Sequence, residues 1–172
     1  MKAHLAIVAA VFLVLTGSDD LTAAPALKPK PERADRIVVE KAARTLTLFR
    51  GNAALATYRV ALGGNPVGPK ERQGDRKTPE GDYTIDFKNA GSRYHLSLKV
   101  SYPDAADRAR AAAAGVSPGG DIMIHGLPNG YGWVGEGHIA QDWTDGCVAV
   151  TNDEIEEIWS LVAVGTPIEI KP

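Results

Sequence analysis

The sequence predicts a mostly β domain, an antiparallel β sandwich or barrel with two short helices. Apolar residues alternate with polar ones over several short segments, as they do in strands that bury one face. Glycine and proline separate these segments, and only two stretches have helical character. Many short strands with turns of this composition are typical of a sandwich or barrel.

Three strands are expected in the first half of the domain. Residues 37–39 and 45–49 are apolar or β-branched on either side of a charged turn, which indicates a hairpin. Residues 56–62 alternate next and stop at a Gly-Gly pair. The following stretch, 65–79, is polar and rich in glycine, proline and charge, so we expect a loop there.

The second half adds further strands and both helices. Strands are expected at 83–87, 96–100, 122–125, 147–150 and 168–170, the last of them at an edge of the sheet. An Ala-rich stretch from Asp104 to Ala114, followed by a glycine, predicts a short helix. Thr151 and Glu154 form a capping-box pattern, which opens a second helix that reaches Val162.

The N-terminus predicts export from the cytoplasm. Lys2 precedes an apolar run from Ala3 to Leu15, and small residues follow it. This is the composition of a secretory signal peptide, and the run is shorter than the roughly 20 residues that span a bilayer. We expect a signal peptide at 1–24, a Pro- and charge-rich linker at 25–35 and one domain at 36–172. An uncleaved N-terminal anchor is the alternative.

Charge and cysteine content narrow the function. The net charge is −2 at pH 7 and no basic block occurs, which argues against nucleic acid or an anionic membrane surface as a partner. No stable membrane insertion is expected after signal cleavage, and the sequence leaves the oligomeric state open. The chain has one cysteine, Cys147, which cannot pair within the chain. It is therefore intermolecular, buried and inert, or reactive.

Two segments carry the candidate chemistry. His125 ends a buried strand and is followed by Gly126, and Cys147 follows Gly146 at the start of another apolar strand. A cysteine nucleophile needs a base within hydrogen-bond reach, and the base needs a third group to fix its tautomer. We expect His125 to be the base, oriented by the Gly126 carbonyl, and the N–H groups of Gly146 and Cys147 to form an oxyanion hole. His138, in the intervening loop, is the rival base.

These motifs resemble those of the YkuD-type L,D-transpeptidases, whose pattern is His-Gly, a loop, then Ser/Thr-x-Gly-Cys and an apolar residue. The match is His125-Gly126 followed by Thr144-Asp145-Gly146-Cys147-Val148. Gly63-Gly64 and Thr78-Pro79-Glu80-Gly81 agree upstream, and the resemblance covers about residues 36–172. Two positions depart: Asp145 stands where many members carry His, and Ala149 where many carry Arg or Asn.

The resemblance implies cysteine acyl transfer on peptidoglycan, in the periplasm or cell-wall compartment, with roles in wall biogenesis and cell shape. Cys147 would attack the carbonyl of an L-to-D peptide bond in a donor stem peptide, which releases the terminal D-residue. The thioester would then pass to the side-chain amine of a second stem. Peptidoglycan stem peptides are thus the expected partners, and no metal or organic cofactor is needed. Pairing with His125 would lower the thiol pKa and give a thiolate at neutral pH.

Four residues are candidates for substrate contact: Tyr102, Trp133, Thr144 and Asp145. The resemblance implies that Tyr102 brings an aromatic hydroxyl near the oxyanion. Trp133 would belong to a Gly-rich lid at 129–137. Packing in the core is the alternative for both aromatic residues. Asp145 would receive a cationic stem group or cap the turn.

Two rival functions stay open. An amidase or L,D-carboxypeptidase would use the same pair, Cys147 and His125, and differ only in letting water resolve the thioester. A catalytically idle wall-binding module would make Cys147 structural, which the paired motifs argue against.

Overall fold

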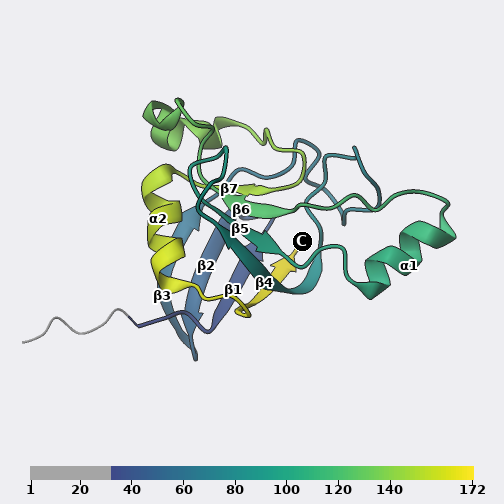
Figure 1. Cartoon of the computed structure of the whole chain (residues 1–172), viewed down its shortest axis with the longest axis horizontal. Coiled ribbons are helices and arrows are strands. Elements are labelled where there is room, and N and C mark those ends of the chain that lie inside the picture. Colours follow the sequence, from purple (N-terminus) through teal and green to yellow (C-terminus); the bar gives the residue numbers. More distant parts are fainter. Residues whose placement is uncertain (1–31) are drawn as a thin grey trace, which may run out of the picture. The chain divides into compact units, whose positions relative to one another are not determined.

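The computed structural model describes residues 32–172, so the signal peptide predicted at 1–24 lies outside the described residues. Eight strands in this part form one curled sheet in the order β3-β2-β1-β8-β4-β5-β6-β7 (Figure 1). The strands are β1 (Arg36–Glu40), β2 (Thr45–Arg50), β3 (Ala53–Arg59), β4 (Gly81–Asn89), β5 (Ser97–Val100), β6 (Met123–His125), β7 (Val148–Ala149) and β8 (Pro167–Lys171). The helices are α1 (Ala105–Ala113), α2 (Asn152–Leu161) and the 3₁₀ helix η1 (Gly132–Ala140).

The mostly β prediction is confirmed, and local patterns account for the individual strands. In the first hairpin Leu46 and Leu48 are buried while Thr47 between them is half-buried, as alternation requires. β1 pairs with β2 in antiparallel register, with Ile37 opposite Leu48. After β3 the chain leaves the hairpin, and Ala61 bridges to Ala149 of β7.

The antiparallel prediction is only partly right, because the sheet is mixed. The pairs β1–β8 and β6–β7 are parallel. Parallel neighbours need a crossover connection of a dozen or more residues, and the segment between β6 and β7 supplies one. The sequence shows this segment as a long loop, but the length of a loop does not reveal whether the two strands that it connects pair with each other.

The expectation that the last strand lies at an edge is wrong. β8 lies inside the sheet, parallel to β1 on one side and antiparallel to β4 on the other. Ile168 and Ile170 are buried there. Alternation predicts a strand with one buried face, but it carries no information on how many neighbours that strand has.

Both predicted helices form, each with a capping box at its start, and a third helix is present. Asp104 and Thr151 each accept from the backbone N–H three residues on, and the side chains of Asp107 and Glu154 reach back to the cap N–H. The Gly-rich stretch expected to be a lid loop instead contains η1, which is kinked at Gly135. Among residues 32–172 no helix is long and apolar enough to cross a bilayer.

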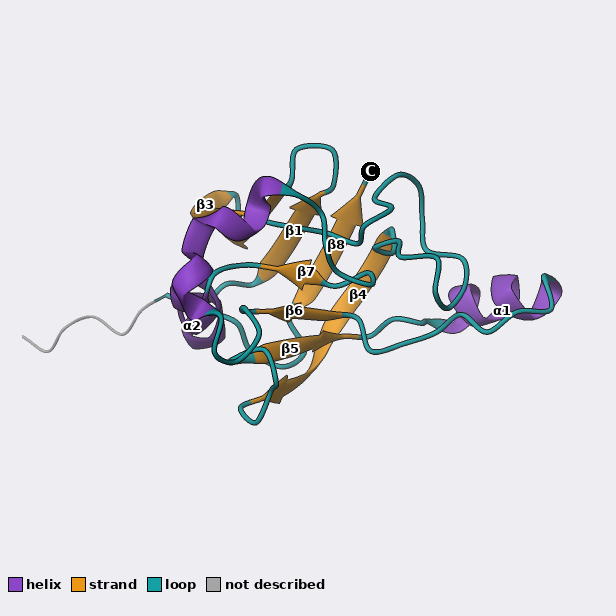
Figure 2. Cartoon of the chain, turned by 90° about the horizontal axis from the view of Figure 1, so that it is seen from above, coloured by secondary structure: helices purple, strands orange, loops and turns teal. Residues whose placement is uncertain are grey.

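The curled sheet brings two groups of strands across each other. Figure 2 shows β5, β6 and β7 running across the direction of β1 and β8, with α1 projecting away from the sheet. β4 passes from one group to the other, and its ladder with β5 is irregular between Ile85 and Phe87, as at a bulge that bends a strand. One core cluster takes side chains from both groups and from α2, so the ends of β6 and β7 rest on a rigid base.

Candidate active site

The parallel pair β6–β7 places the two motif residues side by side. His125 is opposite Ala149 in the register, and Ile124 is opposite Val148. Cys147 immediately precedes β7, and its Sγ accepts a hydrogen bond from the N–H of Met123 at 3.4 Å. Backbone pairing therefore fixes the nucleophile candidate against the strand that carries the base candidate.

Cys147 and His125 line one cavity of about 440 Å³. It lies between the ends of β6 and β7 and the segment that joins β4 to β5. The lining residues are Asn89, Gly91, Ser92, Arg93, Tyr94, Ser97, Asp121, Met123, His125, Trp143, Thr144, Asp145 and Cys147. The volume is within the usual range for a small-molecule or peptide-end site.

His125 is buried, and its neighbours determine its tautomer. Its Nδ1 lies 2.7 Å from the Gly126 carbonyl oxygen. Because a carbonyl can only accept, Nδ1 carries the proton and Nε2 of the neutral ring is left with a free lone pair. Burial lowers the pKa of His125, and the hydrogen bond to Gly126 opposes this only in part. At neutral pH the ring is therefore a neutral acceptor.

Two aromatic residues hold the imidazole in place. The ring of Tyr94 lies 4.5 Å from that of His125 at 43°, and the ring of Trp143 lies 5.8 Å from it at 67°. Such tilted and edge-on contacts leave few other orientations for the imidazole. Tyr94 was not found from the sequence, because it lies in an irregular segment and belongs to no motif.

The Cys147 thiol is partly buried and protonated. It donates to the carbonyl of Asp121 at 3.6 Å. Burial raises the pKa of the thiol, the Met123 N–H opposes this, and the carboxylates of Asp145 and Asp121 raise it further. The expected thiolate at neutral pH is therefore disfavoured in this resting geometry: both partners of the Cys–His pair are neutral. Asp121 contributes a carbonyl, a backbone contact that no side-chain pattern could have indicated.

The turn before Cys147 is built around Thr144. Its Oγ1 accepts from the N–H of Gly146 at 3.1 Å and donates to the carbonyl of Cys147 at 2.8 Å. Gly146 has φ +130°, a region that side chains rarely adopt, and a Cβ there would lie 2.5 Å from the carbonyl oxygen of Lys77. The Gly146 N–H is thus already bonded within the turn. Of the two donors expected for an oxyanion hole, this leaves the Cys147 N–H.

The structure brings some of the other candidates to the cavity and not the rest. Asp145 lines it with a side chain that is 93% exposed. Tyr102 is buried away from it, with its hydroxyl donating to the Pro118 carbonyl at 2.9 Å, and Trp133 is exposed on η1. Substrate contact by Tyr102 or Trp133 therefore stays a prediction without support from the cavity.

The rival base, His138, does not line the cavity of Cys147. It is buried on η1, and neither ring nitrogen has a hydrogen-bond partner among the described residues. It lines a different, mostly apolar cavity of about 310 Å³. Trp143 lines both cavities, and His138 does not line the one that contains Cys147. Within residues 32–172 no group of three His, Cys, Asp or Glu side chains is arranged to hold a metal ion.

Comparison with known proteins places the chain in a family. Residues 34–170 match the YkuD family model, described as the L,D-transpeptidase catalytic domain. YafK of Escherichia coli (strain K12), whose name provisionally places it among the L,D-transpeptidases, is 32% identical over 132 residues. That match covers 73% of this chain and 46% of YafK.

Solved structures share the fold. The helical cell shape determining protein Pgp2 from Campylobacter jejuni superposes with a TM-score of 0.61 at 23% identity, over 83% of this chain and 49% of Pgp2. An L,D-transpeptidase from Mycobacterium smegmatis gives 0.52 at 18% identity, over 81% of this chain and 59% of that one. This chain thus spans about half the length of the first two proteins. The family match extends over nearly all the described residues, so the chain belongs to the YkuD family of L,D-transpeptidase catalytic domains.

Proposed function

We propose that this protein is a peptidoglycan L,D-transpeptidase that works through a Cys147 thioester. The single observation that supports this most is the pairing of Cys147 and His125 on adjacent strands at one cavity, with the Nδ1 proton of His125 committed to Gly126. This arrangement supplies a nucleophile, a base with a free lone pair and a group that orients the base.

The chemistry begins from a neutral pair. The thiol turns from the Asp121 carbonyl toward Nε2 of His125, which takes its proton as sulfur attacks the carbonyl of the L-to-D peptide bond. The Cys147 N–H faces the developing oxyanion. Nε2 then returns the proton to the leaving amine, the C–N bond breaks, and the terminal D-residue departs. A side-chain amine of a second stem attacks the thioester, which forms the cross-link and restores the thiol.

Both partners being neutral has a consequence for the reaction. A neutral imidazole accepts the proton during the attack, so no stable thiolate is required beforehand. The buried site disfavours charge on Cys147 or His125 before the reaction. The negative charge that develops on the carbonyl oxygen of the scissile bond is stabilised by the Cys147 N–H. Export to the periplasm or cell wall, and a part in cell shape, belong to the same proposal.

Purified disaccharide-tetrapeptides provide the test. After incubation with the protein, mass spectrometry is expected to show cross-linked dimers and the released D-residue, both absent with Cys147→Ala. Trimmed monomers without dimers would assign the protein to the hydrolases instead. Turnover by a correctly folded Cys147→Ala protein would refute a thioester mechanism of either kind.

A further inference from the structure

A groove that is distinct from the cavity lined by His138 adjoins the cavity of Cys147. Its volume is about 710 Å³, and Asp121 and Asp145 line both spaces. Its walls come from two segments far apart in sequence, residues 70–76 and 117–121, which are joined by a hydrogen bond from the Gln73 N–H to the Ser117 carbonyl at 2.8 Å. The proposed reaction involves none of the residues that line this groove alone.

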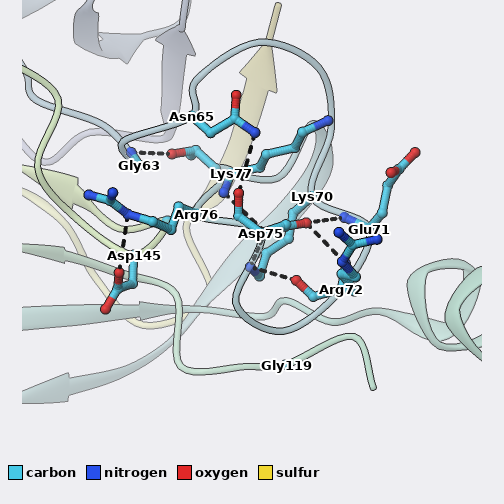
Figure 3. A network of polar contacts seen from close by, with 12 residues as sticks. Gly63, Asn65, Lys70, Glu71, Arg72, Asp75, Arg76, Lys77, Gly119 and Asp145 are labelled. Carbon is cyan, nitrogen blue, oxygen red and sulfur yellow. Dashed lines mark hydrogen bonds and ion pairs between the residues drawn. The ribbon is translucent and has the colours of Figure 1, made fainter. Parts of the chain in front are cut away.

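Asp75 organises the loop that forms one wall (Figure 3). Its carboxylate accepts from the Lys70 ammonium at 2.7 Å and from the N–H groups of Glu71, Arg72 and Lys77 at 2.8, 3.0 and 3.0 Å. The side chains of Asp75 and Lys70 are 7% and 3% exposed. The Lys70 ammonium thus already donates to Asp75 and, at 3.2 Å, to the Arg72 carbonyl, and little of its side chain reaches the groove.

Arg76 is the cation of this loop whose exposed side chain lines the groove. Figure 3 shows its side chain turned away from Asp75 and toward Asp145. A Cβ built on Gly64 would lie 2.4 Å from Nη2 of Arg76, so the guanidinium lies directly on the Gly64 backbone. The side chain is 53% exposed, and its Nε is 3.6 Å from Oδ1 of Asp145. The guanidinium is positioned by the backbone and still accessible from the groove.

The Arg76–Asp145 ion pair is suited to exchange. It is long, and the Asp145 carboxylate is 93% exposed, so the pair contributes little to stability. A guanidinium binds a carboxylate best through two parallel N–H···O bonds, which a 3.6 Å contact through Nε does not provide. An incoming carboxylate could form that bidentate pair and displace Asp145, two residues from the nucleophile.

We propose that Arg76 is a specificity-determining residue that binds a carboxylate of the donor stem peptide. This inference rests on the proposed function and names a substrate group for the same site. Two carboxylates of the donor have the right chemistry: the C-terminal carboxylate of the leaving D-residue and the free side-chain carboxylate of a diamino diacid. The first is only three bonds from the scissile carbonyl carbon, within about 4 Å.

Binding to a protein that cannot react separates this inference from the reaction itself. The probe is a synthetic tetrapeptide stem ending in a diamino diacid and D-alanine, titrated calorimetrically into Cys147→Ala protein. Two matched peptides carry an amide in place of the C-terminal or the side-chain carboxylate. The expected result is a loss of about tenfold or more in affinity, equivalent to about 1.4 kcal/mol, for one of the two amides. Which amide loses affinity identifies the carboxylate.

The second arm repeats the titrations with Arg76 changed. In Cys147→Ala/Arg76→Gln the free acid and the amides are expected to bind equally weakly, while Arg76→Lys keeps part of the preference because it keeps charge without the planar fork. Arg72→Gln, on the same loop but outside both spaces, is the control and is expected to bind like its parent. Thermal unfolding of each variant checks that the fold is kept.

The outcomes are distinct. Three results would each overturn the carboxylate site. The Cys147→Ala protein, with Arg76 unchanged, could bind acid and amides equally well, or could show no measurable binding of the free acid. The Cys147→Ala/Arg76→Gln protein could keep an undiminished preference for the acid. A clear preference for the acid that depends on Arg76 would support the carboxylate site. If the wild-type protein nevertheless showed no turnover, the result would count against the transpeptidase function alone.

Discussion

Removal of the Asp75 charge is expected to destabilise the fold and change its response to acid. Burial by itself would raise the pKa of Asp75, but the Lys70 ammonium and the three backbone N–H groups outweigh it and lower the pKa to about 2 from an ordinary 3.8. Asp75→Asn removes the charge and leaves the Lys70 ammonium buried without a counter-ion. Breaking a buried pair from one side typically costs about 3–5 kcal/mol.

The acid response follows from the same carboxylate. A pKa lowered from 3.8 to about 2 corresponds to about 2 kcal/mol of folding free energy, at about 1.36 kcal/mol per unit. Because the folded-state pKa is the lower one, this stability is complete well above pH 3.8 and is lost as the pH falls toward 2. Linkage places the loss between about pH 5 and pH 2, with about half of it above pH 3. The Asn variant lacks this titration.

Urea unfolding followed by tryptophan fluorescence at pH 7, 5 and 3 measures both effects. Asp75→Asn is expected to unfold at lower urea at pH 7, and its deficit is expected to shrink by about 1 kcal/mol at pH 3. Asp82→Asn, an exposed carboxylate on β4, is the control and is expected to stay within about 0.5 kcal/mol of the wild type. A constant deficit from pH 7 to pH 3, or one below about 1 kcal/mol at pH 7, would refute this account of the loop.

The remaining predictions concern the proposed pair of Cys147 and His125, and the buried Lys41. Cys147→Ser is expected to abolish turnover with the fold intact, because a hydroxyl is a far poorer nucleophile; dimers formed by this variant would contradict the assignment. A carbapenem is expected to add once to the protein, as judged by intact mass, and not to Cys147→Ala. His125→Ala is expected to lower turnover by roughly 10²–10⁴-fold and His138→Ala little; the reverse order would make His138 the base. Thiol alkylation is expected to keep rising through pH 9, because burial raises the pKa of Cys147; a plateau below pH 8 would mean an activated thiolate. Lys41→Met removes donors to Gly68, Thr78 and Glu80 and is expected to cost about 3–5 kcal/mol in urea unfolding, part of it recovered by adding Glu80→Gln.

The features that the sequence predicts well are those that depend on residues close together along the chain. The capping pattern of Thr151 and Glu154 places the start of α2, since both partners lie within one turn. His125 and Cys147 were proposed as a pair because each sits in a short motif at a strand end, and both line one cavity. The hydrogen bond from His125 to the Gly126 carbonyl is likewise local, between adjacent residues.

What the sequence did not predict depends on contacts between distant segments. β8 lies between strands that come from the start and the middle of the domain, and no pattern within 168–170 names them. The thiol pKa is raised because Cys147 is buried against β6, a property of packing that a His–Cys motif does not encode. In the sequence, Arg76 is one of several charged residues in a polar loop. The position of its guanidinium against the Gly64 backbone distinguishes it from the others, and that contact is seen only in the structure.

The parallel pairing of β6 and β7 has an evolutionary consequence. Backbone hydrogen bonds between these strands set the separation of His125 and Cys147, so the middle of the connection, around η1, need only close a loop. Doubling the length of a flexible loop costs only about 0.6 kcal/mol. Residues can therefore be gained or lost around η1 while His125 and Cys147 stay in register. The same freedom makes the kink at Gly135 a natural place to insert a foreign peptide or domain without disturbing the chemistry.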